Sequence, residues 1–264
     1  MTRTDDLTRI REGLRAAAEA IGPYTPGDVA FQIKEVRGDP VTEADHAADA
    51  VLRRILPREG EGWLSEESAD DRTRLGARRV WVVDPIDGTR EFVEGIPEWC
   101  ISIGLVEDGV PVAGGIYAPS TDQLVVGSLE TGVLYNDEHA VVRDPATLDG
   151  AVVLASRSET RRGEWERFAD APFTVRPCGS VAYKMALVAA GQVDATWTLV
   201  PKSEWDVAAG TALVRAAGGR VTLADGSEPP FNQERPKFPN FVAAGPRTSA
   251  MLLSRWLADG RGSS

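Results

Sequence analysis

The 264-residue chain is poor in the residues that most often mark a zinc or thiol site. It has two cysteines, Cys100 and Cys178, and two histidines, His46 and His139. No pair of them has the short spacing of a zinc ligand set, which argues against a zinc centre. Two cysteines also cannot build a disulfide framework, so a reducing compartment is favoured.

Several other signatures are missing as well. No apolar run approaches the roughly 20 residues that span a membrane, and the opening MTRTDDLTRI lacks the apolar centre of a signal peptide. There is neither a Walker loop nor a Gly-x-Ser-x-Gly nucleophile elbow. We therefore expect a cytoplasmic protein with no membrane contact and no P-loop or serine-nucleophile chemistry.

Positive charge is also scarce. The chain has 29 Lys and Arg against 40 Asp and Glu, a formal net charge of −11. Such a surface repels phosphate backbones, so a nucleic-acid polymer is not an expected partner. A small anionic substrate would need local positive charge, from metal ions or from clustered Lys and Arg.

The distribution of apolar residues predicts an α+β protein with two closely packed lobes. Consecutive hairpins over 101–119 and 123–137 favour an antiparallel or mixed sheet, and strands alternate with helices after residue 145. We expect an N-terminal metal-binding lobe over 1–145 and a C-terminal lobe over 146–264 that completes the site. Predicted helices include one capped by Thr4, one opened by a capping box of Thr42 and Asp45, one over 159–170 and one over 248–260.

In the stretch VVDPIDGTREF, residues 82–92, two aspartates directly follow a predicted apolar strand. Asp84 lies at the strand end, Gly88 permits an unusual backbone angle, and Thr89 can cap a following helix. Asp-x-x-Asp-Gly is common turn chemistry, so a structural role is one interpretation. In the other, Asp84 and Asp87 hold divalent cations beside a helix N-terminus that attracts phosphate.

The second interpretation requires further acids, and two segments contain them. WLSEESADD carries Glu66 and Glu67, and SEWDVAAG carries Asp206 at a predicted helix start. Taken singly, an acidic loop and a helix-capping Asp both have structural explanations. Aspartyl-phosphate phosphatases are excluded, because their two acids lie at i and i+2, whereas Asp84 and Asp87 lie at i and i+3.

Four motifs in order, DPVTEAD, LSEES, DPIDGT and WDVAAG, resemble the inositol monophosphatase superfamily of Mg²⁺-dependent, lithium-sensitive phosphatases. DGTREF and LASRSE look most like its 3′(2′),5′-bisphosphate nucleotidase branch, the CysQ-like enzymes of sulfur metabolism. The resemblance implies a layered α/β/α/β/α sugar-phosphatase fold. It also implies hydrolysis of a small phosphorylated metabolite with two or three Mg²⁺ ions.

The resemblance further implies a role for each matching residue. Glu66 and Thr89 would hold the attacking water, and Asp45 would orient Thr89. The phosphate would rest on the N–H groups of Gly88 and Thr89. The implied metal ligands are Glu66, Asp84, the carbonyl of Ile86, Asp87 and Asp206. The implied substrate-binding residues are Asp87, Gly88, Thr89, Ser156, Arg157, Ser158, Gly179, Ser180, Lys184 and Asp206.

Substrate choice depends on the second lobe. Arg157 and Lys184 are cations able to offset a second phosphate. Leu199 and Val200 occupy the place at which the resemblance to the inositol branch would call for a strand end with a glutamate, which argues against inositol. Glu159 argues the other way, because it would repel a nearby phosphate. We predict adenosine 3′,5′-bisphosphate as the substrate, with inositol 1-phosphate or another sugar phosphate as the alternative. A cation-binding relative without turnover is a third possibility, and the protein is expected to be a monomer or a homodimer.

Overall fold

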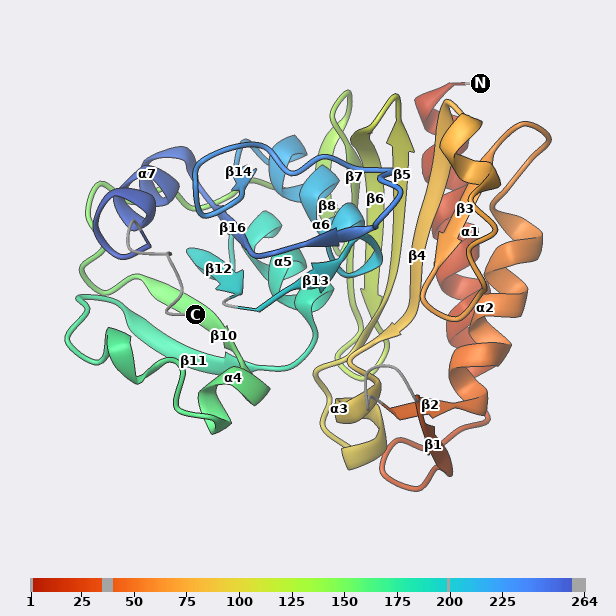
Figure 1. Ribbon diagram of the computed structural model, residues 1–264, viewed down its shortest axis with the longest axis horizontal. Helices are drawn as coiled ribbons and strands as arrows, with labels where there is room; N and C mark the ends of the chain where they lie inside the picture. The colour runs from red at the N-terminus through yellow and green to blue at the C-terminus, as the bar shows by residue number, and fades with distance from the viewer. Residues whose placement is uncertain (1, 35–39, 199, 258–264) are drawn as a thin grey trace.

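The computed structural model describes residues 2–34, 40–198 and 200–257. Its elements form five layers, which run from right to left in Figure 1: a helix pair, a first sheet, a second helix pair, a second sheet and an outer helical layer. The expected layered α+β architecture is therefore confirmed. The boundary at residue 145 stays a prediction.

The first sheet is mixed. Its strand order is β3-β4-β5-β6-β7-β8-β9, and only β3 and β4 pair in parallel. The strands are β3 (Gly62–Ser65), β4 (Arg79–Asp87), β5 (Cys100–Glu107), β6 (Val110–Ala118), β7 (Gln123–Ser128), β8 (Gly132–Tyr135) and β9 (Glu138–Ala140).

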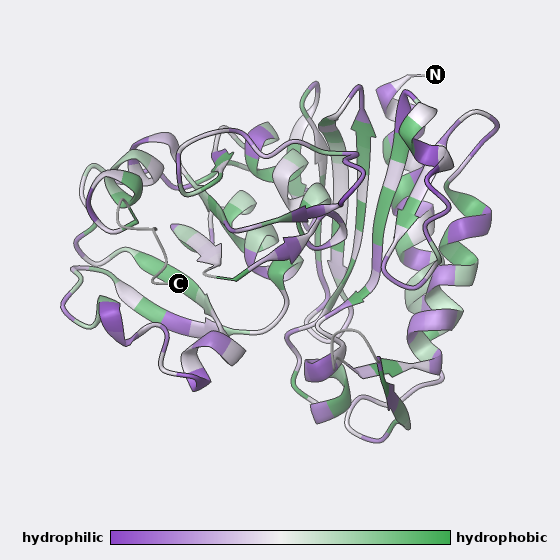
Figure 2. Cartoon of the chain, in the orientation of Figure 1, coloured by the Kyte–Doolittle hydropathy of each residue, from purple (hydrophilic) through white to green (hydrophobic). Residues whose placement is uncertain are grey.

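The two faces of the first sheet carry different helices because side chains alternate along each strand. Ile101, Ile103 and Leu105 of β5 belong to an apolar cluster with α1 (Arg3–Ile21) and α2 (Glu43–Ile55). The opposite face carries α5 (Val181–Ala189) and α6 (Glu204–Ala216). In Figure 2 the strands of the first sheet are largely hydrophobic, whereas α2 at the right carries hydrophilic residues along its outer edge.

Two glycines let α6 lie directly on the sheet. A Cβ atom on Gly104 of β5 would come 2.8 Å from the backbone nitrogen of Ala209, and one on Gly114 of β6 would come 2.7 Å from its carbonyl oxygen. Real Cβ atoms do not approach backbone so closely, so only glycine fits at these positions. The second turn of α6 is thereby held close to the sheet.

The second sheet has the order β11-β10-β12-β16-β14 and mixes parallel and antiparallel pairs. A cluster of aromatic side chains lies against it, with the rings of Trp165 and Trp197 stacked at 4.7 Å. Its strands are β10 (Val152–Ser156), β11 (Thr174–Cys178), β12 (Ala195–Thr198), β14 (Arg220–Thr222) and β16 (Phe241–Ala244), with α7 (Pro246–Arg255) outside.

Shorter elements complete the chain. They are β1 (Phe31–Ile33) with β2 (Pro40–Thr42), β13 (Lys202–Ser203) with β15 (Lys237–Phe238), α3 (Thr89–Glu94), α4 (Arg157–Arg161), and the 3₁₀ turns η1 (Thr73–Gly76) and η2 (Glu166–Phe168). None of the helices in the described part of the chain is long and apolar enough to cross a membrane.

Three details of the predicted helices were wrong or remain untested. The first helix is capped by Thr2 and not by Thr4, because Thr2 and Asp5 form a reciprocal capping box. The helix expected over 159–170 is interrupted by Gly163, whose φ of 78° ends α4 and leaves only η2 beyond it. Residues 258–260 of the last predicted helix lie outside the described residues.

Candidate functional site

A bulge in β4 brings Asp84 and Asp87 to one face of the first sheet. Residues three apart on a regular strand point to opposite faces. Here Asp84 is opposite Ser102 and Asp87 is opposite Cys100, so β4 has one extra residue between the two acids. Because Cys100 and Ser102 share a face, the two aspartates share it as well, toward α5 and α6.

The parallel pairing of β3 and β4 places Glu66 beside Asp84. Ser65 is in register with Val83, and the backbone N–H of Glu66 donates to the carbonyl of Val83 at 3.3 Å. The residues after the two strands are therefore neighbours, although 18 positions separate them in the numbering of the chain. This is the contribution of LSEES to the site.

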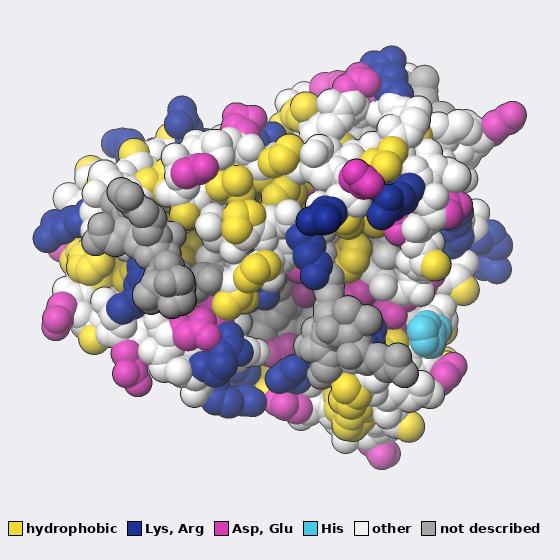
Figure 3. Space-filling view, viewed as in Figure 1, with side chains coloured by type: hydrophobic (Ala, Val, Ile, Leu, Met, Phe, Trp, Pro, Cys, Tyr) yellow, Lys and Arg dark blue, Asp and Glu magenta, His cyan; other side chains and the backbone are white. Residues whose placement is uncertain are grey.

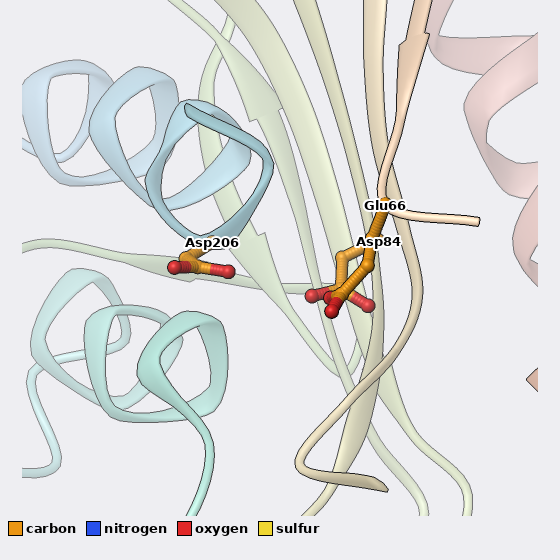
Figure 4. Close-up of side chains that lie close together, drawn as sticks. All are labelled: Glu66, Asp84 and Asp206. Atoms are coloured by element: carbon orange, nitrogen blue, oxygen red, sulfur yellow. The ribbon is translucent and has the colours of Figure 1, made fainter. Parts of the chain in front are cut away.

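Asp206 reaches the same place from α6. Ser203 caps the helix, and its N–H donates to Asp206 Oδ2 at 2.8 Å, which completes a capping box. Glu66, Asp84 and Asp206 each offer an oxygen, and these oxygens lie within 4.8 Å of one another (Figure 4). The capping role considered for Asp206 and its place in an acidic cluster are thus compatible.

The negative charges of the three carboxylates repel one another, and the pKa values of Asp84 and Asp206 show this effect. Burial raises the pKa of Asp84 well above its usual range, and the charges of Glu66, Asp87 and Asp206 raise it further. Burial and the charges of Asp87 and Glu66 raise the pKa of Asp206 to about 7. Among the described residues, Asp84 Oδ2 is buried and has no hydrogen-bond partner. An orphaned buried oxygen in an all-oxygen cluster fits a hard divalent cation.

Asp87 is held from the C-terminal half of the chain. Its Oδ2 accepts hydrogen bonds from the Ser180 hydroxyl at 2.6 Å and from the N–H of Ala182. Burial raises the pKa of Asp87, and these two hydrogen bonds oppose the rise. Ser180 also caps α5, since its hydroxyl accepts from Tyr183 N–H at 2.9 Å.

Thr89 connects the cluster to α2. Its hydroxyl lies 3.1 Å from Asp45 Oδ1 and 3.0 Å from the carbonyl oxygen of Ile86. The prediction that Thr89 caps α3 was wrong, because Gly88, at a φ of 98°, occupies the cap position and Thr89 is the first helical residue. The predicted contact of Asp45 with Thr89 is present.

A pocket of about 400 Å³ opens over these residues. Figure 3 shows the hollow near the middle of the face, with Lys and Arg side chains along its rim. Twelve of the predicted site residues line it, while Asp45 and Asp84 are not part of its lining. The twelve are Glu66, Ile86, Asp87, Gly88, Thr89, Ser156, Arg157, Ser158, Gly179, Ser180, Lys184 and Asp206.

The two cations expected to meet a second phosphate already have partners. The ammonium group of Lys184 donates to the backbone carbonyls of Cys178, Gly179 and Ser180. The guanidinium of Arg157 forms an ion pair with Glu98. Lys184 is also buried.

Glu159 does not face the pocket. Its carboxylate is fully buried and accepts hydrogen bonds from Trp165 Nε1 at 2.9 Å and from Thr198 Oγ1 at 2.7 Å. Glu159 is therefore not placed to repel a phosphate in the pocket, contrary to the expectation from the sequence. Leu199 lies outside the described residues, so its comparison with the inositol branch stays untested.

The sequence interpretation missed several residues near the pocket. Lys34 contacts Glu66 Oε1 at 2.8 Å and also pairs with Glu67, whose pKa burial raises to about 6. Lys202 and Lys237 line the pocket, and neither has an ion pair within the described residues. No motif marks them, since they reach the site only through tertiary folding.

Comparison with known proteins identifies relatives of the whole chain. Residues 5–255 match the family described as the inositol monophosphatase family. An inositol-1-monophosphatase of Mesorhizobium japonicum is 36% identical over 201 residues, 72% of this chain and 74% of the relative. A histidinol-phosphatase of Mycobacterium tuberculosis is 37% identical over 237 residues, 85% of this chain and 84% of the relative.

A solved structure supports the same assignment. The crystal structure of CysQ from Bacteroides thetaiotaomicron, a bacterial member of the inositol monophosphatase family, superposes with a TM-score of 0.76. It has 29% sequence identity and covers 91% of this chain and 97% of that chain. The family match over residues 5–255 includes both sheets and the segments that carry the acids of the site. This chain therefore belongs to the inositol monophosphatase family and is a phosphatase.

Proposed function

We propose that this phosphatase is a Mg²⁺-dependent phosphomonoesterase acting on a small phosphorylated metabolite. The observation that carries the proposal is the acidic cluster of Glu66, Asp84 and Asp206 with its orphaned Asp84 oxygen. Oxygen-only sites of this kind suit Mg²⁺, which commonly shares its ligands with a substrate phosphate. We also propose that the protein works in the cytoplasm, as a monomer or a homodimer.

The carboxylates of Glu66, Asp84, Asp87 and Asp206, with the Ile86 carbonyl, would hold the ions. Bound magnesium supplies positive charge for the phosphate and lowers the pKa of a water molecule. The chain itself contributes a rigid scaffold, because Asp84 and Asp87 are fixed on a buried strand. Asp45 accepts from the Thr89 hydroxyl and so orients it toward the water that attacks the phosphate.

The finer proposal is that the substrate is adenosine 3′,5′-bisphosphate. The DGTREF motif, the CysQ structure and the unpaired Lys202 and Lys237 at the pocket support it. Arg157 and Lys184 support it less than expected, because both charges have partners within the protein. Inositol 1-phosphate remains the second candidate, since a relative at 36% identity is an inositol-1-monophosphatase.

A substrate panel tests both levels of the proposal. Phosphate release is measured with adenosine 3′,5′-bisphosphate, inositol 1-phosphate, fructose 1,6-bisphosphate and histidinol phosphate while Mg²⁺ is varied from zero. The proposal expects no turnover in chelator and the highest kcat/KM for the bisphosphonucleotide. Full activity in chelator would contradict the metal dependence, whereas a preference for inositol 1-phosphate would contradict only the finer proposal.

Calorimetry adds a test without turnover. With a net charge of −11, the metal-free site should bind phosphate compounds poorly. Titration of inorganic phosphate into the protein should give heat in Mg²⁺ and none in chelator. Equal affinity in both conditions would contradict the proposed role of the ions.

A further inference from the structure

Glu98 connects the two halves of the pocket wall. It lies between α3 and β5, and its Oε2 accepts hydrogen bonds from Arg157 Nε at 3.1 Å, from Arg157 Nη2 and from Gly179 N–H at 2.7 Å. Arg157 opens α4 after the second-sheet strand β10, and Gly179 precedes α5. One carboxylate oxygen thus collects donors from two segments that are distant in sequence.

The three donors would suit an anion from the substrate equally well. A guanidinium group and a backbone N–H that converge on one point form a common arrangement for binding phosphate. Arg157 and Gly179 both line the pocket that holds Asp87 and Asp206. In the described part of the chain, Arg157 has no ion pair other than that with Glu98.

We propose that Glu98 is an internal anion that occupies this donor group and sets how well the pocket accepts a second negative charge on the substrate. Glu98 acts through Arg157, so it is a positioning residue for specificity and has no direct part in hydrolysis. The inference rests on the proposed function, since it takes the pocket to be the phosphate site. It concerns any bisphosphorylated substrate and does not depend on adenosine.

Other contacts hold the Gly179 turn without the charge of Glu98. A Cβ on Gly179 would lie 2.4 Å from Glu91 Cγ, so the turn is packed tightly against α3. Lys184 also ties the carbonyls of residues 178 to 180 together. A glutamine at position 98 keeps an oxygen that can accept from Gly179, so Glu98→Gln removes the charge with little change in shape.

The experiment compares two substrates that differ only in the second phosphate, adenosine 3′,5′-bisphosphate and adenosine 3′-monophosphate. In Glu98→Gln the ratio of their kcat/KM values should rise in favour of the bisphosphate. The rise should be on the order of fivefold, because an uncompensated guanidinium attracts the second phosphate. The change should appear mainly in KM, since the acids that hold the metal are unaltered.

Two further variants assign the effect to Arg157. In the double variant Glu98→Gln/Arg157→Gln the gain should disappear, because no cation is released. Glu94→Gln is the matched control, since Glu94 lies on α3 and faces Arg161 of α4 at 3.9 Å, with both side chains exposed. It makes the same change in net charge outside the pocket, and it should leave the ratio unchanged.

Each outcome decides the inference. An unchanged ratio in Glu98→Gln, or an equal loss on both substrates, would overturn it and leave Glu98 as a tie between the two sheets. If thermal unfolding shows that Glu98→Gln does not fold, Glu98→Asp replaces it. The shorter side chain moves the carboxylate away from Arg157 but keeps its charge, so a smaller rise in the ratio is expected. If the wild type hydrolyses neither nucleotide, the finer proposal fails. The ratio of kcat/KM values is then measured with inositol 1,4-bisphosphate and inositol 1-phosphate as the substrate pair.

Discussion

The two ends of strand β4 carry groups of buried and half-buried acids that differ in their cationic partners. At its start, Arg79 belongs to an ion network with Asp6, Glu61 and Glu107, to which Arg3 and Arg9 also contribute. At its end, Asp84 belongs to the acidic cluster with Glu66 and Asp206. In the first group every acid pairs with an arginine, whereas in the second Glu66 pairs with Lys34, and Asp84 and Asp206 have no ion pair within the described residues.

The pKa values follow this difference. Burial raises the pKa of Glu61, but hydrogen bonds from Arg9, Trp81 and Arg79 outweigh it and bring the pKa down to about 2. Burial and neighbouring acids together raise the pKa of Asp84 and Asp206. One fold therefore contains carboxylates that guanidinium groups stabilise and carboxylates without such partners, and the second kind suits the proposed cation site.

The largest effect is expected from Asp84→Asn. It removes a charge from the proposed metal site, and kcat/KM should fall by at least about 10³-fold, or roughly 4 kcal/mol of transition-state stabilisation. The metal-free variant should melt at a higher temperature than the metal-free wild type, because the repulsion within the cluster decreases. Steady-state kinetics and thermal unfolding in chelator measure the two changes. Near-normal turnover would show that the DPIDG segment is only a turn.

Glu61→Gln should have the opposite pattern. It removes one charged acceptor from this network, although Asp6 still pairs with Arg9 and Arg79, and loss of hydrogen bonds to a charged group costs about 2 kcal/mol. Urea unfolding should show this loss, while kcat and KM in saturating Mg²⁺ should stay at wild-type values. The control is Glu130→Gln, because Glu130 contacts Arg3 but its side chain is 63% exposed. Equal destabilisation by both variants would contradict the contrast between the two groups.

The pH dependence of stability separates the groups in the wild type. A carboxyl with a raised pKa favours the folded state only while it is protonated. The contribution of Asp206 is complete below its unfolded pKa of about 4 and is lost as the pH rises through about 7. Glu61 acts in the opposite sense, and its contribution is lost as the pH falls from about 4 toward about 2.

Thermal unfolding in chelator should therefore show a decline of several degrees between pH 5 and pH 8. Mg²⁺ should abolish this decline, because the bound ion compensates the ionised acids. Magnesium should have no effect on the acid limb below about pH 4, which depends on the arginine network. A decline that persists in saturating Mg²⁺ would place its origin outside the cluster.

The sequence predicted the acids of the site better than their surroundings. Asp84 and Asp87 follow an apolar strand, and Glu66 and Asp206 lie in motifs that resemble a known family, so each could be named without coordinates. The bulge that turns both aspartates to one face is a property of pairing with β5 and has no separate sequence signal. The Glu98–Arg157 pair joins residues 59 apart, and only packing of the two sheets creates it.

Local signals also competed with each other along the chain. The 159–170 segment has good helix formers, but Gly163 adopts a left-handed conformation and ends α4 early. Lys184 is predicted as a cation for a second phosphate, yet the turn before α5 folds back so that three carbonyls surround its ammonium group. In both cases the backbone conformation of a single turn decided the outcome, and composition does not reveal it.

The smallest effect is expected from Ser180→Ala, which tests how the C-terminal half supports the cluster. The Ser180 hydroxyl donates to Asp87 Oδ2, and the variant leaves that oxygen with the N–H of Ala182 alone. Loss of one hydrogen bond to a buried carboxylate costs about 1.5 kcal/mol, so the Mg²⁺ concentration for half-maximal activity should rise about tenfold. Ser180→Ala should also destabilise α5, because the same hydroxyl caps the helix by accepting from Tyr183 N–H.

Ser180→Thr is the matched variant for the Mg²⁺ titration, since it retains a hydroxyl that can cap α5 and donate to Asp87, although its branched Cβ at a φ of 50° should lower the unfolding free energy. Calorimetric titration of Mg²⁺ into both variants separates the two roles. A weaker Mg²⁺ affinity in Ser180→Ala that Ser180→Thr restores would assign the hydroxyl to Asp87 and hence to the cluster. A loss of unfolding free energy in Ser180→Ala with wild-type Mg²⁺ affinity would assign it to the helix cap alone. In that case the C-terminal half would contribute Asp206 to the cluster, but its hydrogen bond to Asp87 would not affect Mg²⁺ binding. The acidic group at the end of β4 would then depend only on the first sheet and α6.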